Sequence, residues 1–193
     1  MGVFLYLARH GETSWNQARR WQGWTDVPLN ETGESQASVL AAKVTGLGVD
    51  RIVASDLTRA RQTAEIVARA LSLGPVVADA DLRERGFGCF EGFTPEECEA
   101  RYPDEWHRYR ADGSLPPGAE PYDQVTERML RGVRRAVHTE PASDRAVLVV
   151  THGSALRAFV RVTTGVVLPP LPNAALFRVT ALPDRFLDPT SID

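Results

Sequence analysis

The amino-acid sequence predicts an α/β protein, a three-layer α/β/α single domain with a mostly parallel central sheet. Short apolar runs, typical of buried strands, alternate along the chain with longer segments of helical periodicity. The chain has 193 residues, of which 43% are hydrophobic, and this is enough to bury one sizeable core. Two of the apolar runs, residues 3–8 and 146–150, lead into His-Gly pairs. Parallel strands would bring both pairs to one edge of the sheet. No repeat, low-complexity tract or linker interrupts the pattern, so we expect residues 1–193 to form one domain.

The first half of the chain predicts three strands, two helices and a long loop. Residues 3–8 are apolar, too few to span a bilayer, and follow no cationic leader, so they indicate a buried strand. The loop after this strand reaches Leu29. The next predicted elements alternate between helix and strand: a helix over about 32–45, a strand over 51–54, a helix that starts in segment 55–64 and reaches about 71, and a strand over 75–78. The last strand leads to the loop that carries Glu84.

The second half of the chain begins with a proline-rich segment, residues 93–120, in which we expect one short helix. Its prolines stand at 95, 103, 116 and 117. They interrupt regular structure, and we expect the segment to be an insertion that covers the crevice beyond the strand ends as a lid. The remaining predicted elements are a helix over 122–138, whose apolar stripe faces the core, a strand over 146–151, a helix over 155–165 and a strand over 175–182. The tail after Pro183 carries no signal.

Composition is that of a soluble, cytoplasmic protein. The chain has no long apolar segment and no secretory leader, so we expect no membrane contact. Cys89 and Cys98 lack the spacing of a metal or redox pair, and reduced thiols are the simplest interpretation. The net charge is −3, and Lys43 is the only lysine among 22 Lys and Arg residues. A genome rich in G and C explains this bias as well as phosphate binding does, so the charge predicts no nucleic-acid partner.

The segment Ala8-Arg9-His10-Gly11-Glu12-Thr13 carries the first chemical signal. It ends the first strand, and in open α/β sheets ligands bind beyond the carboxyl ends of the strands. Glycine at position 11 would let backbone amides approach an anion there. A neutral histidine can attack phosphorus through one ring nitrogen when an acceptor holds the other, and the covalent intermediate splits a difficult displacement into two easier steps. The position therefore suits a phosphate, with His10 as a candidate nucleophile.

A second histidine, His152, follows the apolar run 146–150 and is again followed by glycine. Taken alone, a histidine at the end of a strand is more often a hydrogen-bonded structural residue than a nucleophile. Two such histidines at one sheet edge favour a shared site. His107 and His138 lie in polar or helical surroundings, and we interpret both as surface residues.

Four separated segments of the chain form a set. They are Arg9-His10-Gly11-Glu12 with Asn16, Ser55-Asp56-Leu57-Thr58-Arg59-Ala60-Arg61-Gln62-Thr63-Ala64, Leu82-Arg83-Glu84-Arg85-Gly86-Phe87-Gly88, and Thr151-His152-Gly153-Ser154-Ala155-Leu156-Arg157. In kind and order they resemble the motifs of the histidine phosphatase superfamily, the phosphoglycerate mutase-like family, over residues 3 to about 180. The resemblance implies a phosphoglycerate mutase-like fold, a small phosphorylated metabolite as substrate, and no cofactor. We also expect no metal, because Asp, Cys and His form no cluster with metal-ligand spacing. Monomer and homodimer both remain open.

Phosphoryl transfer spreads charge over three equatorial oxygens, so positioned cations stabilise its transition state. We expect Arg9, Arg59 and His152 to supply them. Arg59 and Arg61 are two residues apart on a predicted helix and point to nearly opposite faces, so only one of them reaches the pocket. The resemblance places the clamp at Arg59 and leaves Arg61 at the surface.

Glu84 is the expected general acid, a role typically worth roughly 10²- to 10⁴-fold in rate. The role is implied by the resemblance of Leu-Arg-Glu, followed by Phe-Gly and Glu-Gly, to the acid-bearing loop of the family. The structural alternative is an ion pair between Glu84 and Arg83 or Arg85. Cys89 and Phe90 stand where many members carry a polar residue and tryptophan, a departure that concerns packing.

Further substrate contacts are expected at Asn16, Gln22, Gly23, Gly153 and Ser154. The amide of Asn16 can donate to a phosphate, and residues 22 and 23 resemble the substrate loop of the family. Ser154 either adds a hydroxyl or starts the following helix. We interpret Trp24 and Pro28, in the same loop, as packing residues.

Within the family, a phosphatase is favoured over a mutase. Cofactor-dependent phosphoglycerate mutases of this type carry a longer basic insertion that holds a second phosphate or carboxylate, whereas segment 93–120 is short and resembles the phosphatase branch. A mutase is the alternative, because Arg101, Arg108 and Arg110 could meet an acidic substrate. Pro121 replaces the usual serine of the family, which removes one polar contact. A catalytically silent phospholigand-binding protein is the second alternative, disfavoured because every residue of the expected catalytic set is present.

Overall fold

Six strands form the central sheet in the computed structural model, which describes residues 3–138, 146–181, 186 and 189–192. The order across the sheet is β3-β2-β4-β1-β5-β6. The strands are β1 (Val3–Arg9), β2 (Val49–Ala54), β3 (Val77–Ala78), β4 (Ala146–Thr151), β5 (Leu176–Ala181) and β6 (Thr190–Ser191). The first four strands are mutually parallel where they pair, while β5 is antiparallel to β1 and β6 is antiparallel to β5. The mostly parallel sheet of the prediction is confirmed.

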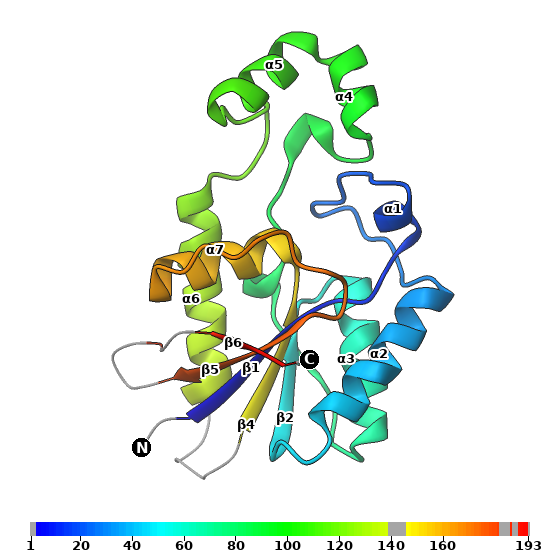
Figure 1. Ribbon diagram of the computed structural model, residues 1–193, viewed down its shortest axis with the longest axis vertical. Helices are drawn as coiled ribbons and strands as arrows, with labels where there is room; N and C mark the ends of the chain where they lie inside the picture. The colour runs from blue at the N-terminus through cyan, green and yellow to red at the C-terminus, as the bar shows by residue number, and fades with distance from the viewer. Residues whose placement is uncertain (1–2, 139–145, 182–185, 187–188, 193) are drawn as a thin grey trace.

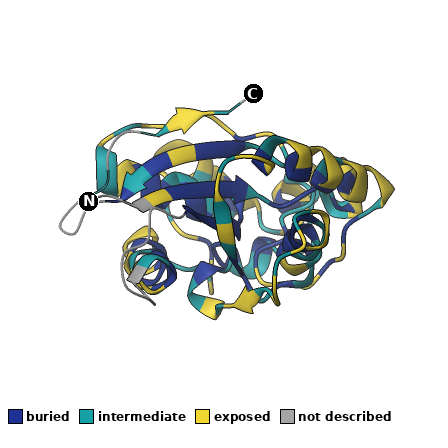
Figure 2. Cartoon of the chain, turned by 90° about the horizontal axis from the view of Figure 1, so that it is seen from below, coloured by how far each residue is buried: buried dark blue, intermediate teal, exposed yellow. Residues whose placement is uncertain are grey.

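Helices cover both faces of this sheet (Figure 1). The helices are α1 (Ser14–Gln17), α2 (Glu31–Val44), α3 (Thr58–Ala70), α4 (Pro95–Arg101), α5 (Pro103–Asp112), α6 (Tyr122–His138) and α7 (Gly153–Thr164), with 3₁₀ turns η1 (Ala80–Leu82) and η2 (Gly88–Phe90). One face packs against α2 and α3, and the other packs against α6 and α7. Figure 2 shows buried strands between helices whose outer sides are exposed. The architecture is the predicted three-layer α/β/α arrangement.

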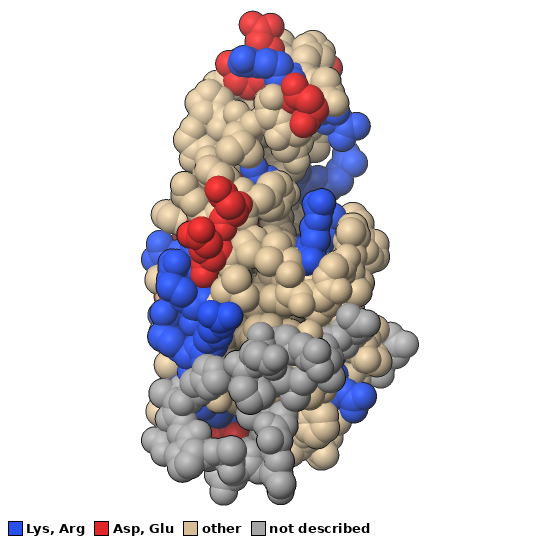
Figure 3. Space-filling model, turned by 90° about the vertical axis from the view of Figure 1, so that its left-hand side faces the viewer, with Lys and Arg blue, Asp and Glu red and all other residues tan. Residues whose placement is uncertain are grey.

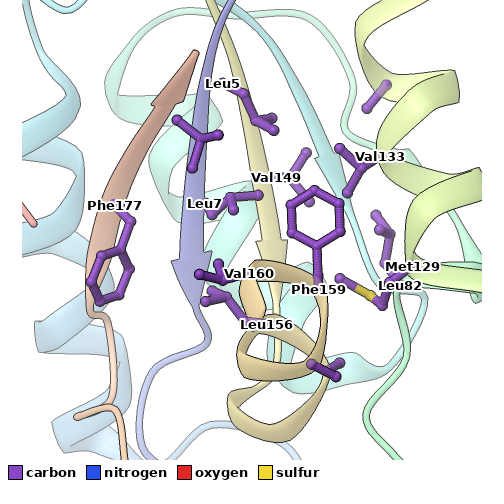
Figure 4. Close-up of a cluster of buried hydrophobic side chains, with 14 of the residues drawn as sticks. Leu5, Leu7, Leu82, Met129, Val133, Val149, Leu156, Phe159, Val160 and Phe177 are labelled. Atoms are coloured by element: carbon purple, nitrogen blue, oxygen red, sulfur yellow. The ribbon is translucent and has the colours of Figure 1, made fainter. Parts of the chain in front are cut away.

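The two cores follow from the alternation of side chains along each strand. In β1, Leu5 and Leu7 join the cluster beneath α6 and α7, whereas Tyr6 and Ala8 join the cluster beneath α2 and α3. Figure 4 shows the first cluster, in which side chains of β1 and β4 meet those of α6 and α7. Burial on both faces explains why β1 and β4 read as continuous apolar runs in the sequence.

Segment 93–120 differs from its prediction, because it contains two helices in place of one. The helices α4 and α5 meet at Tyr102, just before Pro103. A residue before proline avoids helical angles, and proline is favoured at the first position of a helix, so one helix ends and another begins there. Their apolar sides bury a third cluster around Phe90 and Trp106. Figure 1 places both helices beyond the carboxyl ends of the parallel strands, above the rest of the molecule.

Several element ends differ from the prediction by one or more residues. The predicted strand over 75–78 is reduced to Val77–Ala78 at the sheet edge, and the helix predicted to start at 155 begins at Gly153. The tail contributes the short edge strand β6, which no sequence pattern indicates. The strand predicted over 175–182 covers Leu176–Ala181, and its last predicted residue, Leu182, lies outside the described residues. Within the described part of the chain, no helix is both long and apolar enough to cross a bilayer.

Candidate active site

The two strand-end histidines lie side by side at one edge of the sheet. The strands β1 and β4 are parallel neighbours in a register that pairs Arg9 with Thr151, and the His10 amide donates to the Thr151 carbonyl at 3.0 Å. The ring centroids of His10 and His152 are 5.1 Å apart. The predicted meeting of the two His-Gly pairs is therefore confirmed.

His10 is held as a neutral ring with one nitrogen that can act as a nucleophile. The residue is 2% exposed, and its Nδ1 lies 2.6 Å from the Gly11 carbonyl oxygen. Because that oxygen can only accept, Nδ1 carries the ring proton. Burial lowers the pKa of His10 well below its ordinary value, and the charges of Arg59 and Arg9 lower it further. Nε2 therefore keeps its lone pair at neutral pH, as nucleophilic attack requires.

His152 presents an N–H donor to the same space. It is completely buried, and Arg59 Nε donates to its Nδ1 at 3.2 Å. The proton of the neutral ring is therefore on Nε2, which has no hydrogen-bond partner among the described residues. Burial, followed by the charge of Arg59, holds the pKa of His152 well below its ordinary value. The expectation that His152 is a cation is wrong for this reason, and the residue is a neutral donor.

Arg59 ties His152 to the loop that follows α1. Its Nη1 and Nη2 donate to the carbonyls of Thr25 and Gly23 at 2.9 and 2.8 Å. Burial lowers the pKa of Arg59 to about 10, with nearby carboxylates opposing this effect, so the side chain is charged at neutral pH. Arg59 thus supplies a fixed positive charge beside both histidines and also fixes the loop at residues 23–25.

Arg9 contributes a second buried donor. Its Nη1 donates to the Leu171 carbonyl, whereas its buried Nε has no partner among the described residues. A Cβ at Gly153 would lie 3.5 Å from this Nε, so glycine leaves the donor uncovered. Burial lowers the pKa of Arg9, and the Glu84 carboxylate opposes that effect. A buried N–H without an acceptor costs roughly 1–3 kcal/mol. Two such donors, on Arg9 and His152, favour a binding site for a ligand rich in acceptor oxygens.

Glu84 binds the first turn of α7. Its Oε1 accepts from the amides of Arg85 and Ala155 at 2.8 and 2.9 Å, and its Oε2 accepts from the Ser154 amide at 3.1 Å. Negative charge is favoured at a helix N-terminus, where amides lack partners within the helix. Because His152, the N-cap residue, makes no side-chain cap bond, Glu84 takes over that task.

The ion pair considered as the alternative for Glu84 is absent from the described residues. Arg83 pairs with Asp56 at 2.6 Å. The guanidinium of Arg85 lies 4.0 Å from the centroid of the Tyr122 ring and donates through Nε to a backbone carbonyl. The Glu84 carboxylate therefore points away from both arginine side chains and toward the start of α7, directly after His152.

A buried ion pair that no motif in the sequence marks holds the Glu84 loop in place. Arg128 of α6 is 7% exposed and donates to the carbonyls of Asp81, Arg83 and Glu84 at 3.0, 2.6 and 2.9 Å. Its Nε and Nη2 also donate to the two carboxylate oxygens of Glu120 at 2.6 and 2.7 Å. These bonds use all the N–H groups of the guanidinium. The pair acts on Glu84 through the backbone, as a positioning device.

Some of the residues expected to contact the substrate already use part of their hydrogen-bonding capacity within the protein. Asn16 Oδ1 accepts from the Thr13 amide at 3.1 Å and from Asn173 Nδ2 at 3.3 Å, which leaves the amide nitrogen of Asn16 to donate. Asn173, which no sequence signal indicates, also donates to the His10 carbonyl at 3.2 Å. Gln22 is 7% exposed, and its buried Oε1 has no partner among the described residues.

Two glycines of the site are required by close approaches of other groups. At Gly23 the φ angle is +51°, and a Cβ would lie 1.8 Å from a carboxylate oxygen of Glu91. At Gly11 a Cβ would lie 2.4 Å from the Gly33 carbonyl oxygen, and the Gly11 amide donates to Thr63 Oγ1 at 3.0 Å. The Gly11 amide is thus used within the protein and is not itself among the backbone amides that could approach an anion.

Other residues of the predicted set lie as follows. Trp24 is 47% exposed; its ring lies under the Arg83 guanidinium, 5.4 Å from the centroid, and its Nε1 donates to the Glu84 carbonyl at 2.7 Å. Pro28, which was expected to pack, is exposed. Arg61 lies at the surface near Glu65, as expected. His107 is also exposed, and the side chain of His138 lies outside the described residues.

Residues 5–184 match the model of the histidine phosphatase superfamily, branch 1. The chain belongs to this superfamily. It is 39% identical over 159 residues to the uncharacterized phosphatase PhoE of Bacillus subtilis strain 168, with 82% of this chain and 76% of that protein covered. It is 32% identical over 199 residues to a 2,3-bisphosphoglycerate-dependent phosphoglycerate mutase of Methylobacterium sp. strain 4-46, with 100% and 96% covered. A solved mycobacterial glucosyl-3-phosphoglycerate phosphatase, in complex with VO3, is similar with a TM-score of 0.85 and 29% identity, over 98% of this chain and 97% of that one. This superfamily enzyme is thus phosphatase- or mutase-like.

Charged side chains near the histidines differ from the ligand sets of metal sites. In the part of the chain that the structure describes, no group of three or more His, Cys, Asp or Glu residues could hold a metal ion. The positive charge beside His10 comes from Arg9 and Arg59. The charges of both arginines also act on His152. These side chains can therefore take the place of a cation at a phosphoryl group.

Proposed function

We propose that this enzyme hydrolyses phosphomonoesters of small metabolites through a covalent phosphohistidine on His10. The observation that supports this is the arrangement around His10 Nε2. Nδ1 is used by the Gly11 carbonyl, and two buried donors without described partners, Arg9 Nε and His152 Nε2, belong to the same site. Phosphoryl oxygens are the acceptors that such donors require, and Nε2 is the nucleophile that phosphorus requires.

The first chemical step forms the bond between His10 Nε2 and phosphorus while the ester P–O bond breaks. As charge develops on the equatorial oxygens, Arg9, Arg59 and the Nε2–H of His152 stabilise it. At 4 Å and an effective dielectric constant of 20, one pair of unit charges contributes roughly 4 kcal/mol before desolvation is subtracted. In the second step water attacks phosphorus, the P–N bond breaks, and inorganic phosphate leaves.

Glu84 supplies the proton to the departing alkoxide and recovers one from the attacking water. Its two oxygens differ in their surroundings, because Oε1 accepts two amide bonds and Oε2 accepts only one. Oε2 therefore has the spare lone pair, and it is the oxygen that holds and delivers the proton in this proposal.

The contacts of the arginines in segment 93–120 favour transfer of the phosphoryl group to water over its transfer to a second substrate. Its arginines are bound to lid residues: Arg101 lies over Phe93 at 4.7 Å and Arg110 over Trp106 at 5.9 Å, and Arg108 is exposed beside Glu105. A phosphoglycerate mutase is the second candidate, because a relative of that name aligns with the whole chain. Both activities share the phosphohistidine step.

Trapping the intermediate tests the common step. During turnover of a ³²P-labelled phosphomonoester, a quench without acid should leave an acid-labile, base-stable label on His10. His10→Ala should lose both label and turnover, while His107→Ala, at an exposed histidine, should keep both. Full activity of His10→Ala would overturn the mechanism.

The fate of the phosphoenzyme separates the two activities. With 3-phosphoglycerate and a bisphosphoglycerate primer, the proposal predicts inorganic phosphate and little 2-phosphoglycerate. Rapid isomerisation that depends on the primer would make the enzyme a mutase.

A further inference from the structure

A groove of about 620 Å³ lies between α6 and α7, and none of the residues that line it belongs to the candidate active site. Three of the eight large hydrophobic side chains that are exposed in the described part of the chain line this groove: Tyr122 at 51%, Val162 at 59% and Val167 at 70%. Single exposed apolar residues are ordinary on a protein surface, whereas several gathered in one hollow indicate a binding surface. The groove is therefore a candidate interaction surface.

The floor of the groove is part of the packed core. Leu130 and Leu168 line the groove and also pack against the core cluster beneath α6 and α7. Thr126, which is buried, donates through its hydroxyl to the Tyr122 carbonyl at 2.8 Å. A surface built in this way has its shape before a partner binds, which reduces the entropy lost on association.

The groove carries charge of opposite sign on its two sides. Asp123 and Glu127, four residues apart, line it from α6, while Arg157 and Arg161, also four residues apart, line it from α7. No ion pair joins these side chains to one another or to any other residue that the structure describes. Figure 3 shows the side of the molecule that carries α6, where acidic and basic side chains are separated by uncharged surface.

A second copy of this chain is the partner that matches this pattern. A twofold axis that runs along the groove exchanges its two sides, so the acidic side of one copy faces the basic side of the other. The uncharged centres of the two grooves then cover each other. A partner of a single charge sign, such as an acidic peptide, would meet like charge along one side of the groove, which opposes binding.

We propose that this enzyme forms a homodimer through the groove between α6 and α7. Tyr122, Val162 and Val167 form the apolar centre of the interface. At its rim, the carboxylates of α6 face the guanidinium groups of α7 in the partner subunit, and the twofold axis makes this contact occur twice. A hydrophobic centre with a polar rim is the usual arrangement of a specific interface. The proposal does not depend on the reaction, because the groove contains no residue of the candidate active site.

A substitution at the apolar centre is the first test. Sedimentation equilibrium over about 1 to 200 µM protein measures the Kd of the dimer. Val162→Asp places a carboxylate at the centre of the interface in both copies and should raise this Kd roughly 10- to 100-fold. Val39→Asp is the matched control, since Val39 is 55% exposed on α2, at the other face of the sheet, and should leave the Kd unchanged.

Charge reversal on each side of the groove is the second test. Glu127→Arg and Arg161→Glu each reverse one exposed charge, and each homodimer should be roughly 10- to 100-fold weaker than that of the wild type. When the two variants are mixed, one contact between the copies has its wild-type charges and the other brings the two reversed charges together. The mixed dimer should therefore be tighter than either variant homodimer, and native mass spectrometry distinguishes the three dimers by mass.

Salt and folding controls complete the experiment. Raising the salt concentration from about 0.1 to 1 M shortens the Debye length from about 10 to 3 Å, and it should weaken the wild-type dimer more than the mixed variants' homodimers, which have lost that attraction. Circular dichroism and kcat/KM in dilute solution should match those of the wild type for every variant. If Val162→Asp fails to fold, Val167→Asp, at a more exposed position, replaces it.

Two results would overturn the proposal. One is a wild-type protein that stays monomeric at the highest concentration. The other is a dimer whose Kd changes less than twofold in Val162→Asp, Glu127→Arg and Arg161→Glu, because its interface would then lie elsewhere on the molecule. A mixed dimer that is no tighter than the two variant homodimers would likewise exclude the twofold pairing of acidic and basic sides.

Discussion

Replacing Glu84 by glutamine should affect two separate properties, the anchoring of α7 and the delivery of a proton. Glutamine can keep Oε1 facing the amides of Arg85 and Ala155, but it then places an NH₂ group opposite the Ser154 amide, where Oε2 now accepts at 3.1 Å. Two donors would face each other at that point. The variant therefore loses one charge-assisted hydrogen bond at the start of the helix as well as its ionisable proton.

The two losses have different sizes. The missing hydrogen bond should lower the free energy of unfolding by about 1–3 kcal/mol, and each kcal/mol lowers the Tm of a protein of this size by roughly 2–4 °C. The missing proton should slow phosphorylation of His10 by alkyl phosphates roughly 10²- to 10⁴-fold, which corresponds to about 3–5 kcal/mol of barrier. A nitrophenolate leaves without needing a proton, so nitrophenyl phosphate should lose far less.

Single-turnover phosphorylation is the assay, because a slow hydrolytic step would mask the contrast in steady-state rates. Glycerol 3-phosphate and nitrophenyl phosphate are compared in the wild type and in Glu84→Gln. Asp26→Asn is the matched control, since Asp26 accepts from the Thr58 amide and hydroxyl at 2.7 Å at the start of α3. This control loses a similar helix anchor and should slow both substrates by similar factors.

Equal losses for both substrates in Glu84→Gln would refute the reasoning. Glu84 would then be an anchor for α7 and nothing more. A leaving-group contrast in Asp26→Asn would identify Asp26 as the acid, and Glu12, which accepts from Asn30 Nδ2 at 2.9 Å, would be the next carboxylate to replace.

Three further predictions follow from the site. Arg128→Met strands the buried Glu120 carboxylate and should lower the free energy of unfolding by about 3–5 kcal/mol in urea titrations. Adding Glu120→Leu should recover part of this loss, and no recovery would contradict the pairing. The pKa values of His10 and His152 lie below those of an unfolded chain, so the unfolded state binds more protons and stability should fall as the pH drops below about 6.5. The slope is roughly 1.4 kcal/mol per pH unit for each histidine. Urea titrations at pH 7.5 and 5.5 measure it, and His152→Asn should remove its share; an unchanged slope would argue against a depressed pKa. Dialysis against a chelator should leave kcat unchanged, whereas activity lost and then restored by magnesium or zinc would contradict a metal-free mechanism.

Features set by local periodicity could be predicted from the sequence. The apolar runs that end at Arg9 and Thr151 identify two strands buried on both faces, and parallel pairing then brings His10 and His152 together. Arg59 and Glu84 were assigned through the resemblance of their short motifs to those of the family, because local periodicity alone left Arg61 and an ion pair of Glu84 as alternatives. These features depend on residues that are close in the chain.

Features that depend on distant residues could not be predicted. The Arg128–Glu120 pair is buried only because α6 passes beneath the Glu84 loop, and Asn173 reaches His10 only because β5 returns beside β1. The charge of His152 was also beyond the sequence, since its neutral state follows from complete burial next to Arg59. Pro103 is compatible with two helices in segment 93–120, but a single short helix satisfied the same sequence pattern.

The charges at the site favour both the binding of phosphate and the attack of His10 on phosphorus. The charges of Arg59 and Arg9 and the burial of His10 all disfavour its protonated form, so a proton cannot easily occupy the nitrogen that attacks phosphorus. The same positive charges, with the Nε2–H of His152, attract a phosphate anion to that nitrogen. A cation at His152 would add to this attraction, but forming it would require protonating a completely buried ring beside Arg59, which the site disfavours. The site thus uses fixed guanidinium charge to bind phosphate and leaves both imidazoles neutral, one as nucleophile and the other as donor.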